Sequence, residues 1–376
     1  MPRNSSRRAW PLAAVVAAGT IGVMASTSPA RAELKEDPCA CSANKPGFFR
    51  RAQLTGDWDD NRDALKDRGL VPQLTYAGEL FVTPGLRRDL VYAGLAVLSL
   101  DVDLTKLVAE SLGAIHLSAL GIHGSGLSEE LGDLYGVSGN VGPSDVRLFE
   151  AWIEQPIWKA TLRLGLVSAD QEFILARHST ALLNATFGII SQASVNILGP
   201  VYPVARPGAS ARLELPALTV RAAVYDGDQL ESHGVPTGIA GHPLVMGEVE
   251  LYEWIKLGFW HHMALGSGYY AVIDHQLDRY LGAFVRGGDS PNANETVSHY
   301  VDAGIRIGPG PFRKGDFIGL GVAYVRTHGM ELGDQSLAEA TYQAQFGWLT
   351  IQPDFQLLVL RDRTAAIAAT RVTLVF

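Results

Sequence analysis

Charged residues recur at every second position in several apolar stretches between residues 145 and 226. Residues two apart on an extended chain point to the same side, so each stretch presents one apolar and one polar face. Carboxylates and guanidiniums on a polar face form ion pairs or hydrogen-bond polar solutes, and in mid-strand they require water or partners. The polar face carries Glu150, Trp152, Glu154, Arg163, Arg212, Glu214 and Arg221, and Phe149, Ala151 and Ile153 lie on the apolar face.

Two other patterns contain groups that could act in catalysis or metal binding. Glu248 and Glu250 share a strand face, and glycosidases use paired carboxylates. His261 and His262 are adjacent, but neighbours on a strand point to opposite faces, which disfavours shared metal ligation. No G-x-S-x-G motif of hydrolases occurs in the chain. We therefore expect no enzyme, no metal and no cofactor.

The elements that position the polar face are strands, because the alternation extends along most of the chain. The predicted strands are residues 71–81, 91–104, 114–122, 145–155, 160–166, 211–215, 218–225, 246–254, 255–262, 268–277, 280–286, 299–307, 317–326, 340–346, 349–359 and 365–376. Soluble sandwiches also alternate, but charges in mid-strand favour a membrane barrel with a water-filled lumen. We predict an all-β fold, a transmembrane antiparallel up-and-down β-barrel of about 16 strands.

The connection between the fifth and sixth predicted strands, residues 168–206, is far longer than a hairpin needs. Short and long connections alternate along the chain, so this segment would be the third outer loop. Its residues Asp170, Glu172, Arg177 and His178 could project into a pore, or they could hold the loop to the wall by salt bridges. A loop of this length could fold inward and narrow a channel.

The N-terminal residues 1–32 read as a cleaved signal peptide. Arg3, Arg7 and Arg8 precede an apolar stretch, and Ala30-Arg31-Ala32 matches a cleavage site. Residues 33–69 would form an N-terminal periplasmic segment with a short helix within 54–68, capped by Asp57, and residues 70–376 the barrel. A second helix-like piece covers residues 128–134. The predicted location is the bacterial outer membrane.

The charge of the chain argues against nucleic acid as a partner. The net charge is −8, and removing the four arginines of residues 1–32, which contain no acidic residue, moves it to −12. A phosphate backbone requires clustered lysine and arginine. Cys39 and Cys41, the two cysteines, receive no assigned function.

Ordered motifs from residue 54 to the C-terminus resemble the carbohydrate-selective outer-membrane porins of the OprB type. They include Leu54-Thr55-Gly56-Asp57-Trp58, Arg147-Leu148-Phe149-Glu150-Ala151-Trp152-Ile153-Glu154-Gln155, Asn184-Ala185-Thr186-Phe187-Gly188, Phe284-Val285-Arg286 and Tyr300-Val301-Asp302-Ala303-Gly304. Asp274-His275-Gln276 departs from the pattern, where a contiguous Asp-Gln pair is expected. Residues 357–364 also lack an expected Pro-Gly-Gly.

The resemblance implies passive, substrate-selective diffusion of mono- or small oligosaccharides through a water-filled pore, in which Trp152 could stack on a sugar. The candidate pore-lining or constriction residues are Glu150, Trp152, Glu154, Arg163, Asp170, Glu172, Arg177, Arg212, Glu214, Arg221, Asp302 and Arg306. A general or other small-solute porin is the main alternative, and a barrel-based outer-membrane enzyme the weaker one.

The partners implied are small sugars, outer-membrane lipid and lipopolysaccharide. The last strand ends in Phe376 and resembles the signal read by the barrel-assembly machinery. Association into a homotrimer is left open.

Overall fold

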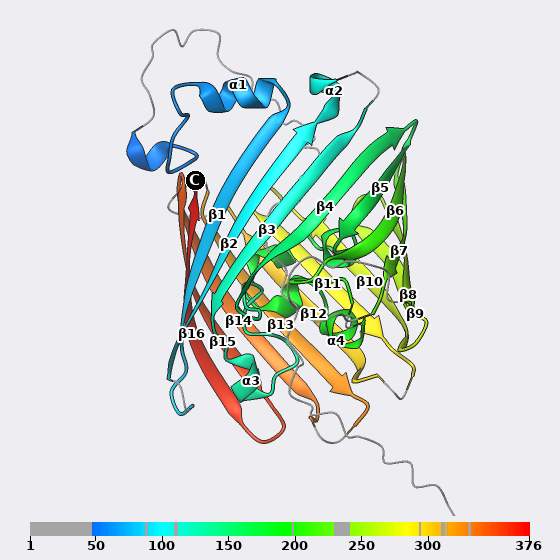
Figure 1. The fold of residues 1–376 in the computed structure, drawn as a ribbon. Coiled ribbons are helices and arrows are strands. Elements are labelled where there is room, and N and C mark those ends of the chain that lie inside the picture. Colours follow the sequence, from blue (N-terminus) through cyan, green and yellow to red (C-terminus); the bar gives the residue numbers. More distant parts are fainter. Residues whose placement is uncertain are drawn as a thin grey trace, which may run out of the picture.

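Sixteen antiparallel strands close into one barrel, in which each strand pairs with the next and β1 pairs with β16 (Figure 1). The computed structural model describes residues 47–376 except 87–88, 109–111, 198, 229–240, 293–294, 310–312, 314 and 330–331. The strands are β1 Leu70–Val82, β2 Leu90–Asp103, β3 Ala114–Gly124, β4 Asp145–Ile157, β5 Ala160–Val167, β6 Arg206–Leu215, β7 Leu218–Asp226, β8 Pro243–Leu251, β9 Ile255–His262, β10 Gly266–Gln276, β11 Leu281–Asp289, β12 Val297–Ile307, β13 Phe317–Thr327, β14 Gln335–Phe346, β15 Leu349–Val359 and β16 Thr364–Val375. The predicted all-β barrel of 16 strands is confirmed.

Helices are short and lie in the connections. They are α1 Asn61–Asp67, α2 Leu104–Leu107, α3 Ser128–Leu131 and α4 Ser191–Ile197, with 3₁₀ turns η1 Phe48–Arg50, η2 Ala169–Gln171, η3 Ser179–Ala181 and η4 Ala185–Phe187. Asp57 was expected to cap the first helix, and this prediction is wrong: Asp60 directly precedes α1, and no side chain caps it. Within the described chain, none of the helices has the length and apolar character needed to cross a membrane.

The two ends of the barrel differ in their connections. At the turn end, β6 joins β7 through Pro216 and Ala217, and β14 joins β15 through Gly347 and Trp348. Ala217 and Gly347 have φ of 62° and 63°, the left-handed backbone that two-residue hairpins favour. The N-terminal segment and the C-terminus also lie at this end (Figure 1), where Leu54 N–H donates to the Val375 carbonyl at 2.7 Å. The opposite, loop end carries the 125–144 loop and the 168–205 loop.

Along each strand, apolar residues point outward and alternate with residues that face the lumen. Leu98, Ile153, Leu164 and Leu257 are exposed on the outer face, as expected for a surface in contact with lipid. The lumen-facing positions between them carry the polar residues. The alternation that the sequence displays therefore corresponds to lipid on one side and the barrel interior on the other.

A β-bulge in β4 reverses one of the predicted orientations. The register to β3 shifts between Leu117 and Ala119, so β4 holds one extra residue opposite Ser118, which is the geometry of a bulge. Phe149 and Glu150 both become buried, and the Phe149 ring packs edge-to-face on Tyr202 of the 168–205 loop, with centroids 6.0 Å apart. The expectation that Phe149 shares the outer face with Ile153 is wrong for this reason.

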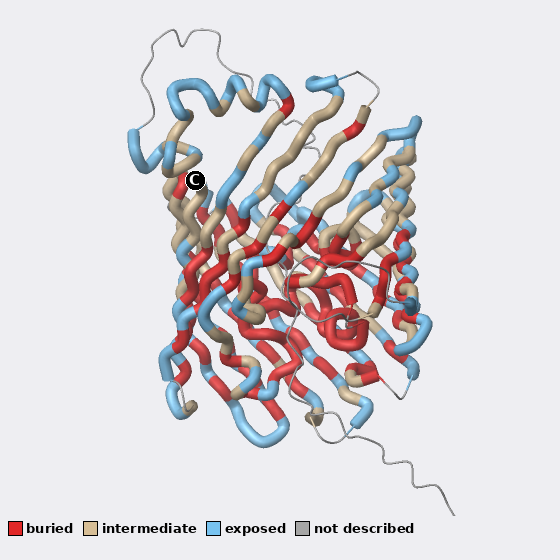
Figure 2. The backbone as a smooth tube through the Cα atoms, viewed as in Figure 1, coloured by how far each residue is buried: buried red, intermediate tan, exposed pale blue. Residues whose placement is uncertain are grey.

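The 125–144 and 168–205 loops fold into the barrel and provide its apolar core. Tyr135 and Phe173 from these loops join Trp260 and Phe284 from the wall in one buried cluster. Buried residues are concentrated in the half of the barrel nearer the loop end, whereas the strands nearer the turn end are mostly partly buried or exposed (Figure 2). The lumen is thus filled by packed side chains near the loop end and accessible to solvent near the turn end.

Candidate functional site

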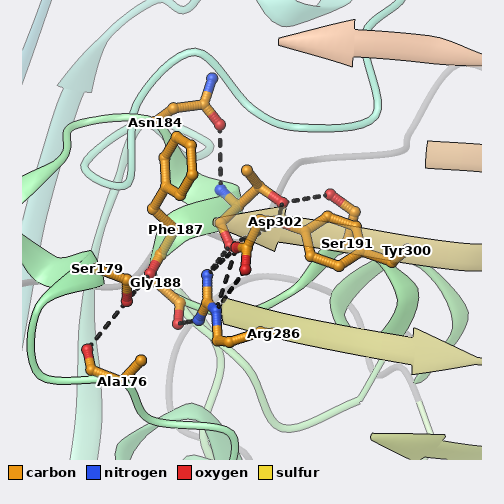
Figure 3. Close-up of polar contacts among 10 residues, drawn as sticks. Ala176, Ser179, Asn184, Phe187, Gly188, Ser191, Arg286, Tyr300 and Asp302 are labelled. Atoms are coloured by element: carbon orange, nitrogen blue, oxygen red, sulfur yellow. Dashed lines mark hydrogen bonds and ion pairs between the residues drawn. The ribbon is translucent and has the colours of Figure 1, made fainter. Parts of the chain in front are cut away.

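The 168–205 loop is attached to the wall at Arg286 of β11 and Asp302 of β12 (Figure 3). These two residues are cross-strand partners, and the Arg286 Nε–H donates to both carboxylate oxygens of Asp302 at 3.1 Å. The same guanidinium donates to the carbonyls of Gly188 and Thr186 at 2.9 and 2.8 Å. Tyr300 donates its hydroxyl to Asp302 at 2.7 Å. Every charge in this buried cluster therefore has hydrogen-bond partners, as burial requires.

A second attachment lies on β14 and β15. Glu339 accepts the backbone N–H of Asn184 at 3.1 Å and that of Leu183. The Asn184 amide donates to the Gln356 side-chain oxygen at 3.0 Å, and Gln356 in turn donates to the Val137 carbonyl at 2.9 Å. The 125–144 and 168–205 loops are thus joined to each other through the barrel wall.

A third group of contacts ties the loop to β8 and β10. Glu248 accepts the Ile174 N–H at 3.0 Å. Asp274 accepts the backbone N–H groups of Arg177 and His178, and it also pairs with the His178 ring. The other ring nitrogen of His178 lies 2.9 Å from the Gln276 oxygen. Asp274 and Gln276 therefore both contact His178, and the exposed His275 between them points outward.

Arg163 is the centre of a partly exposed cluster on the wall of β3 to β5. Its guanidinium pairs with Glu154 at 2.7 Å and with Glu172 of the loop at 2.8 Å. It lies 3.9 Å from the centroid of the Trp152 ring. His116 stacks on the same indole at 5.0 Å between centroids. Because His116 and Arg163 come from the strands on either side of Trp152, the indole lies between them.

Arg221 forms a similar arrangement on β7. It pairs with Glu248 at 2.8 Å and with Glu250 at 2.6 Å. The two carboxylates that suggested a glycosidase are therefore both bound to one guanidinium. Arg212 pairs with Glu214 at 3.0 Å in a more exposed position. No group of three or more histidine, cysteine or acidic residues that could hold a metal occurs among the described residues.

The structure separates the candidate residues by exposure. Glu150 and Asp302 of the wall and Asp170 of the loop are buried. Partly exposed residues are Trp152, Glu154, Arg163, Glu172, Arg212, Arg221 and Arg306, and exposed ones are Arg177 and Glu214. Trp152, Glu154, Arg163 and Glu172 come together in one cluster, and Asp302 instead belongs to the Arg286 attachment.

Sequence reasoning missed several residues that hold the loop. They are Arg286, Glu339, Gln356 and Asp274. His116, which stacks on Trp152 of the wall, was also missed. Alternation could have placed Arg286 and Asp302 on the lumen side. Their pairing depends on the register of β11 against β12, which no local pattern encodes.

A closed sixteen-strand barrel with a loop packed inside and a charged lumen defines a porin-type channel. The model of the family described as "Carbohydrate-selective porin, OprB family" matches residues 87–249 and 264–376. The chain belongs to this family. The predicted function, passive sugar-selective diffusion, is thereby confirmed, and family and fold together indicate the outer membrane.

Solved structures show the same fold. The high-pH structure of Pseudomonas putida OprB aligns with a TM-score of 0.75 at 19% identity, covering 87% of this chain and 99% of that one. The low-pH structure of the same protein gives a TM-score of 0.61 at 18% identity, covering 87% and 99%. A mutant of the Rh. blastica porin aligns at 0.56 and 10% identity, covering 82% and 100%. A comparison with curated protein sequences finds no significant match.

Proposed function

We propose that sugar selectivity is set by the partly exposed ion pairs of the lumen wall, Glu154–Arg163–Glu172 and Glu248–Arg221–Glu250. The observation that carries this proposal is that each guanidinium lies between two carboxylates. Such a group offers fixed donors and acceptors to the hydroxyls of a polyol, which can both donate and accept. Since each group carries only one net negative charge, it binds a neutral solute without strong attraction of an ion. Binding remains weak enough for release, as conduction requires.

The buried candidates have a different role in this proposal. Glu150 accepts the backbone N–H of Ser168 at 3.0 Å, and Asp170 accepts the Ser168 hydroxyl and the Tyr202 N–H. Asp302 pairs with Arg286. These carboxylates hold the two ends and the middle of the 168–205 loop. They influence permeation indirectly, because they fix where the loop lies in the lumen.

Trp152 acts on Arg163 rather than on the sugar. Its ring lies between the imidazole of His116 and the guanidinium of Arg163, so neither face is free for a pyranose ring. Contact with an aromatic face orients a guanidinium. Trp152 is therefore a positioning residue for the cluster.

The remaining assignments are extensions of the same proposal. Residues 1–32 act as a cleaved signal peptide, but they fall outside the described residues, as do Cys39 and Cys41. The segment 33–69 lies in the periplasm, so the turn end faces that compartment, and residues 70–376 form the barrel. Lipopolysaccharide surrounds the loop end, and the barrel-assembly machinery reads the last strand. Transport is passive and involves no catalysis.

The decisive experiment is conductance of the folded protein in a planar bilayer while glucose and longer oligosaccharides are titrated. Discrete conductance steps with saturable block by sugar support the proposal. If Arg163→Gln weakens this block and Arg326→Gln does not, sugar binding is assigned to the Glu154–Arg163–Glu172 group. Arg326 lies on β13 and is exposed on the outer side, so its replacement removes the same charge outside the lumen. Steps that no sugar blocks would instead identify a general porin.

A further inference from the structure

The described N-terminal segment, residues 47–69, lies at the joint where the barrel closes. In the strand order, β1 and β16 are neighbours that stand at opposite ends of the chain, so no loop connects them directly. We call this β1–β16 joint the seam. The segment leads into β1 at Leu70 and lies beside the C-terminus at the turn end (Figure 1). Its contacts can therefore hold the two strands of the seam together.

The strand ladder of the seam ends before β1 does. β1 pairs with β2 along its whole length, whereas its register with β16 starts at Thr75. Past that point, the Phe376 N–H donates to the Leu74 carbonyl at 2.9 Å. The Val375 carbonyl instead accepts the Leu54 N–H at 2.7 Å. Unpaired main-chain groups at a strand edge are available to water or to another chain, and here the N-terminal segment binds one of them.

Arg62 of α1 binds the residue that follows β16. Its Nη1 donates to the main-chain oxygen of Phe376 at 3.2 Å, and its Nη2 donates to the Thr55 hydroxyl at 3.0 Å. The guanidinium also lies 4.0 Å from the centroid of the Trp58 ring. Stacking on an aromatic ring and a bond to a neighbouring hydroxyl orient a guanidinium for its remaining contacts. The segment thus directs Arg62 toward the end of β16.

The start of the segment covers the turn between β14 and β15. The Trp348 indole N–H donates to the Phe48 carbonyl at 3.0 Å. The rings of Phe48 and Phe49 lie 5.2 and 5.9 Å from the Trp348 ring, centroid to centroid. A Cβ added at Gly347 would lie 2.3 Å from the Arg51 carbonyl oxygen. The turn therefore has a glycine where the segment approaches it most closely.

On the other side of the seam, the end of the segment is bonded to the strands that follow it. The Lys106 ammonium, in the connection from β2 to β3, donates to the Lys66 carbonyl at 3.2 Å. The Asp103 N–H of β2 donates to the Gly69 carbonyl at 2.7 Å. The segment is thus bonded to the β14–β15 turn and β16 on one side and to β2 on the other.

From these contacts we infer that residues 48–62 form a clasp that locks the seam at the turn end. The clasp is a conformational device, since it can release the end of β16 while the rest of the barrel stays paired. It is the last joint to form when the barrel closes and the first to open when the seam separates. This inference concerns barrel closure and is independent of the proposed function.

The test is hydrogen exchange of the folded protein, followed by mass spectrometry of its peptides. Local opening exposes only the amides of the region that opens. In Arg62→Gln, residues 370–376 should exchange about tenfold faster than in the wild-type protein, the scale of one hydrogen bond from a charged group. The β7–β8 ladder, distant from the seam in the strand order, should exchange as before. Block of the channel by glucose should also be unchanged, because Arg62 lies outside the lumen.

Two further variants separate the contact from the charge. Arg68→Gln removes a positive charge from an exposed side chain just after α1 and should leave exchange of residues 370–376 unchanged. Thr55→Val keeps the Arg62 charge but removes its hydroxyl partner, so it should accelerate exchange by less than Arg62→Gln. It also serves as the test if Arg62→Gln does not fold. Equal exchange of residues 370–376 in Arg62→Gln, Thr55→Val and the wild-type protein overturns the clasp. Acceleration that extends equally to the β7–β8 ladder overturns it as well, because the effect would then be global.

Discussion

Arg286 and Asp302 face each other across β11 and β12 with both side chains fully buried, and the arginine also holds two carbonyls of the 168–205 loop. The position of the loop therefore depends on the register between β11 and β12. A shift of one residue in either strand would move its member of the pair to the lipid side and separate the two groups. The loop is therefore held by the same hydrogen-bond ladder that closes the barrel.

Asp302→Asn should release the middle of the loop without unfolding the barrel. It leaves the buried Arg286 charge uncompensated, which costs about 3–5 kcal/mol. We expect faster proteolysis within residues 168–205 and larger, noisier conductance steps, measured on the folded protein. The apolar pair Arg286→Met/Asp302→Leu should destabilise the barrel less than Asp302→Asn, since it leaves no buried charge, but it should also release the loop because it removes the donor to Gly188 and Thr186. Equal protease resistance of wild type and Asp302→Asn would contradict this role.

Arg163→Gln should shift the channel toward cation selectivity. The change leaves Glu154 and Glu172 without the guanidinium that both contact, so the lumen gains net negative charge. The reversal potential in a salt gradient measures this directly, and Glu154→Gln should move it in the opposite direction. We expect sugar block to weaken about tenfold in Arg163→Gln, the scale of one charge-assisted hydrogen bond. Identical reversal potentials in the two variants would place the selective region elsewhere.

Trp152→Leu tests whether the indole acts through Arg163. If it positions the guanidinium, Trp152→Leu and Arg163→Gln should each weaken glucose block, and the double variant should be little worse than Arg163→Gln alone. Such non-additivity is the signature of residues that act as a unit. Additive losses would instead indicate that the sugar contacts the indole directly.

Phe149→Ala should loosen the end of the loop near Tyr202, because the ring of Phe149 is 4% exposed and packs on that tyrosine. Removing a buried phenylalanine ring costs about 3–5 kcal/mol in a soluble core. Ile153→Ala, on the same strand but facing outward, is the matched control and should leave the loop intact. Hydrogen exchange of residues 199–205 measures the difference, and equal protection in both variants would refute the inward packing of Phe149.

Much of the wall could be predicted from the sequence because alternation encodes both the strand and its two faces. The long segment after β5 stood out by length alone. Phe149 was assigned to the outer face wrongly, because the extra residue of the bulge in β4 turns its side chain toward the lumen. The residue opposite the bulge, Ser118, gives no indication in the sequence that a bulge is present. In the sequence, Asp274-His275-Gln276 interrupts a motif. On a strand, the intervening His275 puts Asp274 and Gln276 on one side, where both contact His178.

The contacts that position residues 168–205 have a mechanical consequence for the whole barrel. A wide cylinder held only by its hydrogen-bond ladder flattens easily when the surrounding bilayer compresses it. Here one loop is bonded to β8 through Glu248, to β11 through Arg286 and to β14 through Glu339, so it braces distant parts of the circumference against one another. We therefore expect the loop to resist flattening of the cross-section, and with it a change in the largest solute admitted, when lateral pressure in the membrane rises.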